Sequence, residues 1–212
     1  MRKCVWVVWV NNYYPKVCGL TINLLYKYAV NIGADFRLIT ERKFPEFPPN
    51  FEKFQVHELG LKYDYNILID ADFVVHPELE DVSQNVPLTH FGAFMFYGAH
   101  FYFKDLDYAF LRDERDLAVV TNFVVTTRLT HDAWKPPKEP AALLSKMVHN
   151  KWCLDEFVFS RNVAKYGLKH CGIFTQEPAA FEHLELTAAR KEGRDEFAYA
   201  KSVIERILSV QN

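Results

Sequence analysis

Two aspartates one residue apart, Asp70 and Asp72, are the residues of this sequence whose type and spacing most favour chemistry. They end the apolar segment 66–70, which predicts a buried strand. Residues two apart in an extended segment point the same way, so both carboxylates can converge on one ligand. Carboxylates held close together repel each other, and a divalent cation that prefers oxygen ligands relieves this repulsion. The pair therefore predicts a Mg²⁺ or Mn²⁺ site that in turn binds phosphates.

The elements around this pair are predicted from apolar runs, helical periodicity and turn residues. We expect strands at 3–10, 35–40, 66–70, 117–127 and 168–174, and a strand, turn and strand over 91–103. We expect helices at 17–29, 77–82, 141–150, 154–166 and 185–210, and a loop at the proline-rich segment 43–50. The alternation predicts an α/β fold with a central mixed, mostly parallel sheet flanked by helices, which binds ligands at the carboxyl ends of its strands.

Length and charge narrow the class of protein. The 212 residues suit one domain spanning 1–212, and a tail without a clear stop signal also fits the N-terminal part of a longer protein. A net charge of −2 argues against nucleic acid as a partner, and no apolar run has the roughly 20 residues of a membrane span. Four cysteines without a CxxC pair indicate reduced thiols in a cytoplasmic protein.

The segment ILIDADFVV (67–75) resembles the DXD region of the GT-A glycosyltransferases, above all the family 8-like group that includes glycogenin and bacterial galactosyltransferases. The resemblance implies a Rossmann-like GT-A fold and a nucleotide-sugar donor, typically a UDP-sugar, bound through Mn²⁺ or Mg²⁺. In that family the last Asp of the motif is a metal ligand and the first contacts the metal or the ribose. Asp72 and Asp70 would take these roles, with Ala71 between them in the donor site.

The turn after the first strand resembles the turn with which the family cradles the nucleoside. The residues that would line this pocket are Val10, Asn11, Asn12, Tyr13 and Tyr14. An Asn amide can bind the edge of a base and a Tyr ring can stack on its face. The alternative is that they are only turn formers and core aromatics.

Two further polar residues resemble catalytic positions of the family. Asn122 matches an Asn that lies near the donor sugar, although the small residue and Gly that often follow it in the family are replaced by Phe123 and Val124. Asp155 matches the first acid of an Asp-Gln pair at a helix start, where it would contact sugar hydroxyls or the reacting centre. Alternatively, Asp155 is a carboxylate at a helix N-terminus without a catalytic role.

A late histidine, His183, resembles the further metal ligand that the family places after its last strand. An imidazole beside carboxylates favours Mn²⁺ over Mg²⁺, although a lone His can also be a packed or surface residue. The Lys-Pro-Trp that follows in the family is missing here. Arg190, with Lys191 as an alternative, and Lys62 are the expected contacts to phosphate or sugar.

The combined prediction is a metal-dependent glycosyltransferase that moves a sugar from a UDP-sugar to a hydroxyl of a glycan or protein. Family 8-like enzymes retain the anomeric configuration, so retention is expected; an inverting enzyme needs a carboxylate base, for which Asp155 is the candidate. The compact length is similar to that of virus-encoded capsid-glycan transferases of the chlorella-virus kind. An enzyme of that kind would act in the host cytoplasm.

Three other classes remain open. Segment 70–74 matches the D-x-D-x-T/V motif of haloacid dehalogenase-type phosphatases, in which Asp70 would attack phosphorus, Asp72 would be the acid/base and Mg²⁺ would assist. That motif normally lies on the first strand, and a later paired-acid motif is missing. Sugar-nucleotide pyrophosphorylases have a Gly-rich phosphate loop that residues 11–19 lack. A non-catalytic binding domain needs no pair of acids, and in it the pair would merely end a strand.

Overall fold

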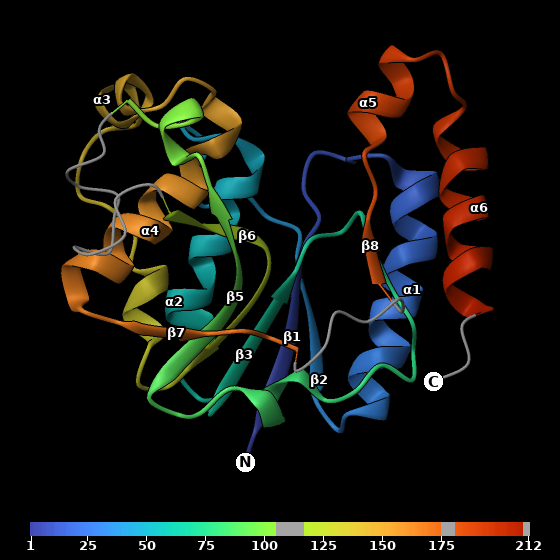
Figure 1. Cartoon of the computed structure of the whole chain (residues 1–212), viewed down its shortest axis with the longest axis horizontal. Helices are drawn as coiled ribbons and strands as arrows, with labels where there is room; N and C mark the ends of the chain where they lie inside the picture. Colours follow the sequence, from blue (N-terminus) through green and yellow to red (C-terminus); the bar gives the residue numbers. More distant parts are fainter. Residues whose placement is uncertain (105–116, 175–180, 210–212) are drawn as a thin grey trace.

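The computed structural model describes residues 1–104, 117–174 and 181–209, and its centre is a six-stranded sheet (Figure 1). The strand order is β2-β1-β3-β6-β5-β7. β1 pairs parallel with β2 and β3, β5 pairs parallel with β7, and β6 is antiparallel to both β3 and β5. The strands are β1 (Lys3–Val8), β2 (Asp35–Ile39), β3 (Tyr65–Ile69), β5 (His90–Tyr97), β6 (Leu117–Thr127) and β7 (Lys169–Cys171). The predicted mixed, mostly parallel α/β sheet is confirmed.

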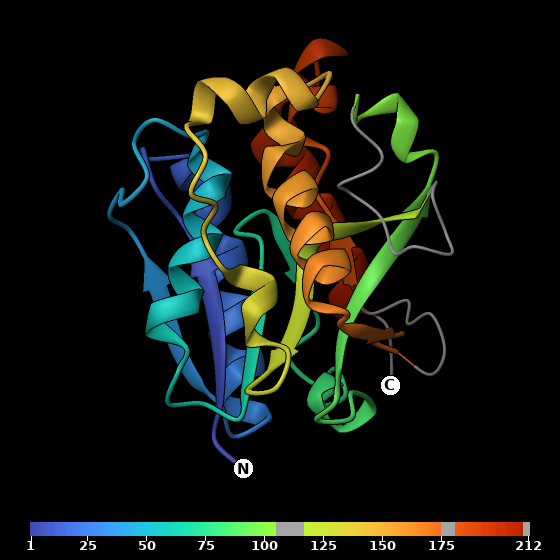
Figure 2. The same cartoon turned by 90° about the vertical axis from the view of Figure 1, so that its left-hand side faces the viewer.

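Helices cover both faces of this sheet (Figures 1 and 2). On one face α1 (Pro15–Asn31) packs beside α6 (Glu196–Leu208), with α5 (Leu186–Lys191) preceding α6. The other face is covered by α2 (Val56–Leu59), α3 (Ala141–Leu144) and α4 (Leu154–Tyr166). None of the helices in the described ranges is both long and apolar enough to cross a membrane.

The core has two main layers because side chains of a strand alternate between the faces of the sheet. Trp6 and Leu68 belong to the layer under α4, whereas Val7 and Ile67 belong to the layer under α1. Strands β1 and β3 are buried on both faces, which explains why they are continuous apolar runs in the sequence.

The strand order reverses at β1, and this reversal creates the crevice that holds the site. From β1 the chain passes through α1 to β2 on one side, and later returns to place β3 on the other side. Ligands of open α/β sheets bind at such a switch point, outside the carboxyl ends of the strands. Here the segments that follow β1 and β3 meet at that edge.

A second, two-stranded sheet continues the chain beyond this edge. β4 (Phe73–Val75) is antiparallel to β8 (Phe181–His183), and Phe73 pairs with His183. This register brings the late histidine beside the residues that end β3.

Several predicted elements are wrong in extent. The segment 91–103 forms one strand, because Gly98 has a φ of 87° and turns the chain into a 3-10 helix at Ala99–Phe101. The helix expected at 77–82 is replaced by a turn and a 3-10 helix, Val82–Asn85, which the Asp81 side chain caps. The helix expected at 141–150 ends early, since Val148 is extended and bridges to Phe103.

Near the ends of the chain the differences are smaller. The strand expected at 168–174 is limited to β7. The helix expected at 185–210 is divided into α5 and α6 by a turn at Gly193, whose φ is 73°, and Val210 lies outside the described residues. The predicted loop at 43–50 ends in a 3-10 helix, Pro49–Gln55, that runs into α2 and was not predicted.

Candidate active site

Asp70, Asp72 and His183 come together at the carboxyl edge of the sheet. Each offers one ligand atom, and these atoms lie within 4.8 Å of one another. Asp70 directly follows β3, where its N–H donates to the carbonyl of Asn122 in β6 at 2.8 Å. His183 Nε2 lies 3.4 Å from Asp72 Oδ1, as the pairing of β4 with β8 requires. Two carboxylates and one imidazole form a donor set that fits Mn²⁺ or Mg²⁺.

The protonation of these three groups follows from their mutual contacts. Burial raises the pKa of Asp70 to about 6, against the lowering effect of Lys53. Burial also acts to raise the pKa of Asp72, but hydrogen bonds from His183 and Tyr13 bring it below its usual value. Burial acts to lower the pKa of His183, which the bond to Asp72 and the nearby carboxylates nevertheless raise to about 9. In the metal-free site His183 therefore carries a positive charge, and this proton would have to leave for the imidazole to bind a cation.

Tyr13 contributes to this cluster from the turn after β1. Its hydroxyl donates to Asp72 Oδ2 at 2.9 Å. The turn is tight, and Asn11, Asn12 and Tyr14 have positive φ values of 57°, 53° and 34°. Such values are ordinary for Asn and costly for Tyr, so the chain holds local strain at the site. Pro15 then begins α1, where its fixed φ suits the first turn of a helix.

A buried lysine, Lys53, lies behind Asp70 and was not predicted. Its Nζ is 2.8 and 3.0 Å from the two Asp70 oxygens and 3.0 Å from Asp155 Oδ2. It also donates to the carbonyl of Thr121 at 3.2 Å. Burial acts to lower the pKa of Lys53, but the two carboxylates raise it above its ordinary value. The sequence carries one signal for it, a lysine in a segment between the apolar residues Phe51 and Phe54.

Asp155, at the start of α4, is fully engaged by neighbouring donors. Besides Lys53, Oδ2 accepts a hydrogen bond from the Thr121 hydroxyl at 2.8 Å, and Oδ1 accepts one from Asn50 Nδ2 at 2.7 Å. Its side chain is 1% exposed. Asp155 therefore faces Asp70 through the ammonium of Lys53 and does not open directly to the cavity.

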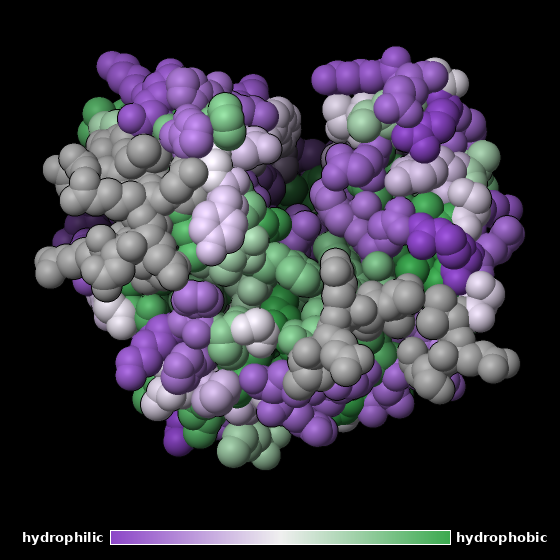
Figure 3. Space-filling view, in the orientation of Figure 1, coloured by the Kyte–Doolittle hydropathy of each residue, from purple (hydrophilic) through white to green (hydrophobic). Residues whose placement is uncertain are grey.

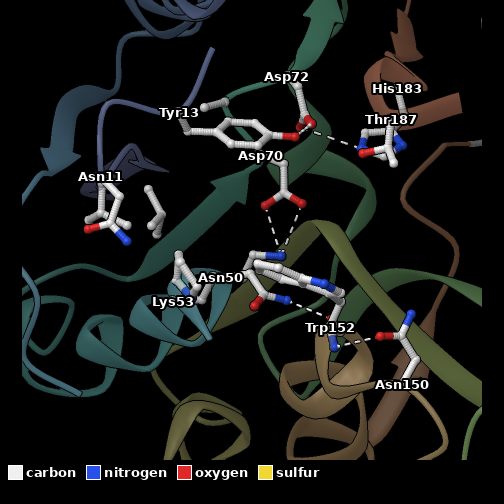
Figure 4. Close-up of a pocket in the computed structure, with 14 residues that line it drawn as sticks. Asn11, Tyr13, Asn50, Lys53, Asp70, Asp72, Asn150, Trp152, His183 and Thr187 are labelled. Atoms are coloured by element: carbon white, nitrogen blue, oxygen red, sulfur yellow. Dashed lines mark hydrogen bonds and ion pairs between the residues drawn. The ribbon is translucent and has the colours of Figure 1, made fainter. Parts of the chain in front are cut away.

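A cavity of about 530 Å³ lies in front of this cluster, within the size range of small-molecule sites. Figure 3 shows the surface notched between the part that carries α3 and the part that carries α5. Figure 4 shows polar side chains around the cavity. Its lining residues are Val8, Val10, Asn11, Tyr13, Pro49, Asn50, Lys53, Asp70, Ala71, Asp72, Asn150, Trp152, His183 and Thr187.

The structure brings some of the predicted donor-site residues to this cavity and not others. Val10, Asn11, Tyr13 and Ala71 line it. The carbonyl of Ala71 is bonded by the buried Thr21 hydroxyl of α1, which holds the loop between the two aspartates.

The other predicted residues lie around or away from the cavity. Asn12 is exposed in its turn, and Tyr14 packs under the Arg190 guanidinium, 4.9 Å from its ring centroid. Arg190 itself pairs with Glu196 of α6. Lys62 lies over the Tyr63 ring at the opposite end of β3, so the fold does not bring it to the site.

Asn122 lies beside Asp70 without lining the cavity. Its backbone carbonyl holds Asp70, and its buried Oδ1 has no hydrogen-bond partner among the described residues. Asn50, Asn150, Trp152 and Thr187 line the cavity and were missed, because they lie in segments whose position depends on tertiary packing.

Comparison with known proteins gives a likeness of fold. No family model matches the chain, and no curated protein sequence matches it. The crystal structure of a glycosyltransferase involved in the glycosylation of the major capsid of PBCV-1 is similar, with a TM-score of 0.57 and 10% identity over 95% of this chain and 100% of that chain. The crystal structure of A197 from STIV aligns with 66% of this chain, over 71% of the A197 chain, at 13% identity. Its TM-score of 0.38 is too low to bear on the fold. The chain thus shares its α/β fold with a glycosyltransferase.

Proposed function

We propose that this protein is a metal-dependent glycosyltransferase that moves a sugar from a UDP-sugar to a hydroxyl of a glycan or protein acceptor. The observation that carries the proposal is the cluster of Asp70, Asp72 and His183 on the wall of a cavity, at the switch point of the sheet. The likeness of the whole fold to a glycosyltransferase supports the same reaction class.

The donor set of the cluster supports Mn²⁺ or Mg²⁺ as the cofactor. Asp70 and Asp72 would hold the cation with carboxylate oxygens and His183 with an imidazole nitrogen. The cation would offset the negative charge that develops on the departing nucleoside diphosphate. The hydroxyl of Tyr13 fixes the orientation of Asp72 in this set.

The nucleoside would bind along the turn that follows β1. Val10 and Asn11 line the cavity there, and Tyr13 extends from the same turn to the aspartates. An Asn amide suits the polar edge of uracil, and the apolar side chain of Val10 suits the base or the ribose. Arg190 lies beside this turn on Tyr14 and would have to leave Glu196 to reach a phosphate.

The contacts of Asp155 support transfer with retention. An inverting enzyme needs a carboxylate that can take the proton of the acceptor hydroxyl. Both oxygens of Asp155 already accept hydrogen bonds from Lys53, Thr121 and Asn50. Asp155 therefore acts as a positioning residue that holds Lys53, and through it Asp70, in place.

The test is calorimetric titration of UDP and UDP-sugars in the presence of Mn²⁺ and again with EDTA. Wild-type protein is expected to bind UDP only with Mn²⁺, and Asp72→Asn is expected to lose this binding. Glu58→Gln removes an exposed carboxylate that pairs with Lys43 away from the cavity, so it is the matched control and should bind as wild type does. UDP binding that is equal with Mn²⁺ and with EDTA, or unchanged in Asp72→Asn, would contradict the proposal.

The transfer itself is tested by the release of UDP from the sugar nucleotides that bind. Binding of GDP or dTDP in place of UDP would correct the nucleotide and keep the reaction class. Failure of every nucleotide to bind, together with Mg²⁺-dependent hydrolysis of a phosphomonoester, would replace the proposal with the phosphatase alternative.

A further inference from the structure

Trp152 is a large aromatic side chain that the fold leaves half exposed on the wall of the cavity. It is 52% exposed, whereas Trp6 is 4% and Trp134 0% exposed. Burial of so large an apolar surface is favourable, so an exposed indole in a cavity is a binding surface that a ligand can cover. Figure 4 shows it near Asn150, on a different side of Asp70 from Asn11.

The backbone of Trp152 is held from both sides. Its N–H donates to Asn150 Oδ1 at 3.1 Å, and its carbonyl accepts from Asn50 Nδ2 at 2.8 Å. Residues Lys151–Cys153 form a 3-10 turn that runs directly into α4. The backbone that carries the indole is therefore fixed by hydrogen bonds, which reduces the conformational entropy that is lost when a ligand binds.

A series of hydrogen bonds connects the Trp152 backbone to the Asp70, Asp72 and His183 cluster. Asn50 Nδ2 bonds both the Trp152 carbonyl and Asp155 Oδ1, and Lys53 joins Asp155 to Asp70. Every link in this series is a hydrogen bond of 2.7 to 3.0 Å. The position of the Trp152 backbone relative to the carboxylate of Asp70 is thereby set by these hydrogen bonds.

We propose that Trp152 is the platform of an acceptor subsite and packs against the C–H face of a pyranose ring. This inference rests on the proposed glycosyl transfer and adds the chemical class of its acceptor, a saccharide. An indole suits a sugar because one side of a pyranose carries mainly C–H groups and packs on an aromatic face. Asn150 lines the cavity beside it, and its Nδ2, which has no hydrogen-bond partner among the described residues, can donate to a sugar hydroxyl.

The exposure of Trp152 favours the acceptor over the donor. The nucleoside is assigned to the turn after β1, and the diphosphate to the aspartates, which leaves the indole on a different side of Asp70 from the nucleoside. A saccharide that belongs to a longer glycan must enter from solvent and extend back into it. A platform that is half open to solvent fits such a ligand.

The test uses methyl α- and β-pyranosides of glucose, galactose, mannose and xylose as probes, with UDP and Mn²⁺ bound. Saturation-transfer NMR on the ring protons of the glycosides reports binding, and acrylamide quenching of tryptophan fluorescence reports coverage of the indole. Because Trp6 and Trp134 are buried, Trp152 and the partly exposed Trp9 are the sources of quenchable signal, and Trp152→Phe gives the baseline that Trp9 contributes. At least one glycoside is expected to bind and to protect the wild-type fluorescence from acrylamide.

The variants separate a stacking role from a structural one. Trp152→Phe keeps an aromatic ring and should retain most of the affinity for the glycoside, whereas Trp152→Ala should lose about five- to ten-fold, the scale of one aromatic contact. Tyr97→Ala removes another exposed aromatic, 79% exposed and outside the cavity lining, and should bind as wild type does. UDP titration with Mn²⁺ on Trp152→Ala shows whether the donor side is intact.

Two results would overturn this inference while leaving the proposed function in place. One is wild-type UDP binding without binding or protection by any glycoside. The other is a Trp152→Ala protein that binds UDP and the glycosides normally but binds UDP-sugars weakly, which would assign the indole to the donor sugar. Failure of wild-type protein to bind UDP is a different result and would count against the proposed function itself.

Discussion

Lys53, which is buried, and Asp70, which is partly exposed to the cavity, form an ion pair at the candidate metal site, with Nζ 2.8 Å from Oδ1. The ammonium is shared with Asp155, so one cation faces two carboxylates. The pair links three elements that are distant in sequence: the 3-10 helix Pro49–Gln55, the end of β3 and the start of α4. It therefore has a structural role whatever the ligand.

Lys53→Met is expected to lower the free energy of unfolding by about 3–5 kcal/mol, because it leaves two carboxylates in a buried place without their cation. Urea denaturation followed by circular dichroism measures this loss. Lys43→Met is the matched control, since Lys43 pairs with Glu58 on the surface and should contribute about 0–1 kcal/mol. Equal losses in both variants would show that Lys53 has no special role.

Tyr13→Phe is expected to weaken Mn²⁺ binding at the proposed site about ten-fold, because the Asp72 carboxylate, the proposed ligand, loses the hydrogen bond that orients it. Titration of the protein with Mn²⁺, followed by the electron paramagnetic resonance of the free ion, measures the affinity. Tyr26→Phe removes the hydroxyl of an exposed tyrosine in α1 and should leave the affinity unchanged. An unchanged affinity in Tyr13→Phe would mean that Asp72 is oriented without Tyr13.

The sheet, the turn after β1 and the loop after β3 could be predicted from the sequence because their signals are local. The apolar runs that become β1 and β3 end in polar residues, and parallel strands place those ends at one edge. The turn at Asn11 and the loop at Asp70 follow from this alone. The strand expected beyond Gly98 failed for a related reason: the apolar pattern continued, but a positive φ at Gly98 ended the strand.

The other side of the site could not be predicted from local patterns, because it depends on contacts between distant segments. His183 was expected beside Asp72 from the family resemblance alone, since the register of β4 and β8 decides this proximity and no local pattern specifies that register. Lys53 and Trp152 lie in short 3-10 segments whose positions are set by packing and by side-chain hydrogen bonds. A hydrophobic period of three over so few residues gives little signal.

Gly60→Ala is expected to destabilise the fold by about 1–3 kcal/mol, because a Cβ there would lie 2.5 Å from Asn66 Oδ1 and 2.7 Å from the carbonyl oxygen of Val56. Asn66 cannot move freely, since Oδ1 accepts from Trp6 Nε1 in the core. Gly19→Ala is the control, because a Cβ at that exposed site in α1 meets nothing within 4 Å and should stabilise the helix by about 0.5–1 kcal/mol. Thermal unfolding should therefore shift in opposite directions, and a shift of both variants in one direction would contradict this account.

Glu156 is expected to make the stability of the protein fall as the pH rises. Burial, together with the adjacent Asp155 and with Asp70, raises the pKa of Glu156 from 4.5 to about 8, against the lowering effect of Lys53. Cys153 also faces this carboxyl. Between these two pKa values the folded chain holds a proton that the unfolded chain has released, so the contribution of Glu156 to stability is complete below about pH 4.5 and is lost progressively up to about pH 8. Glu156→Gln should remove this loss and gain stability relative to wild type across that range, as measured by urea unfolding at a series of pH values; parallel curves for the two proteins would contradict the prediction.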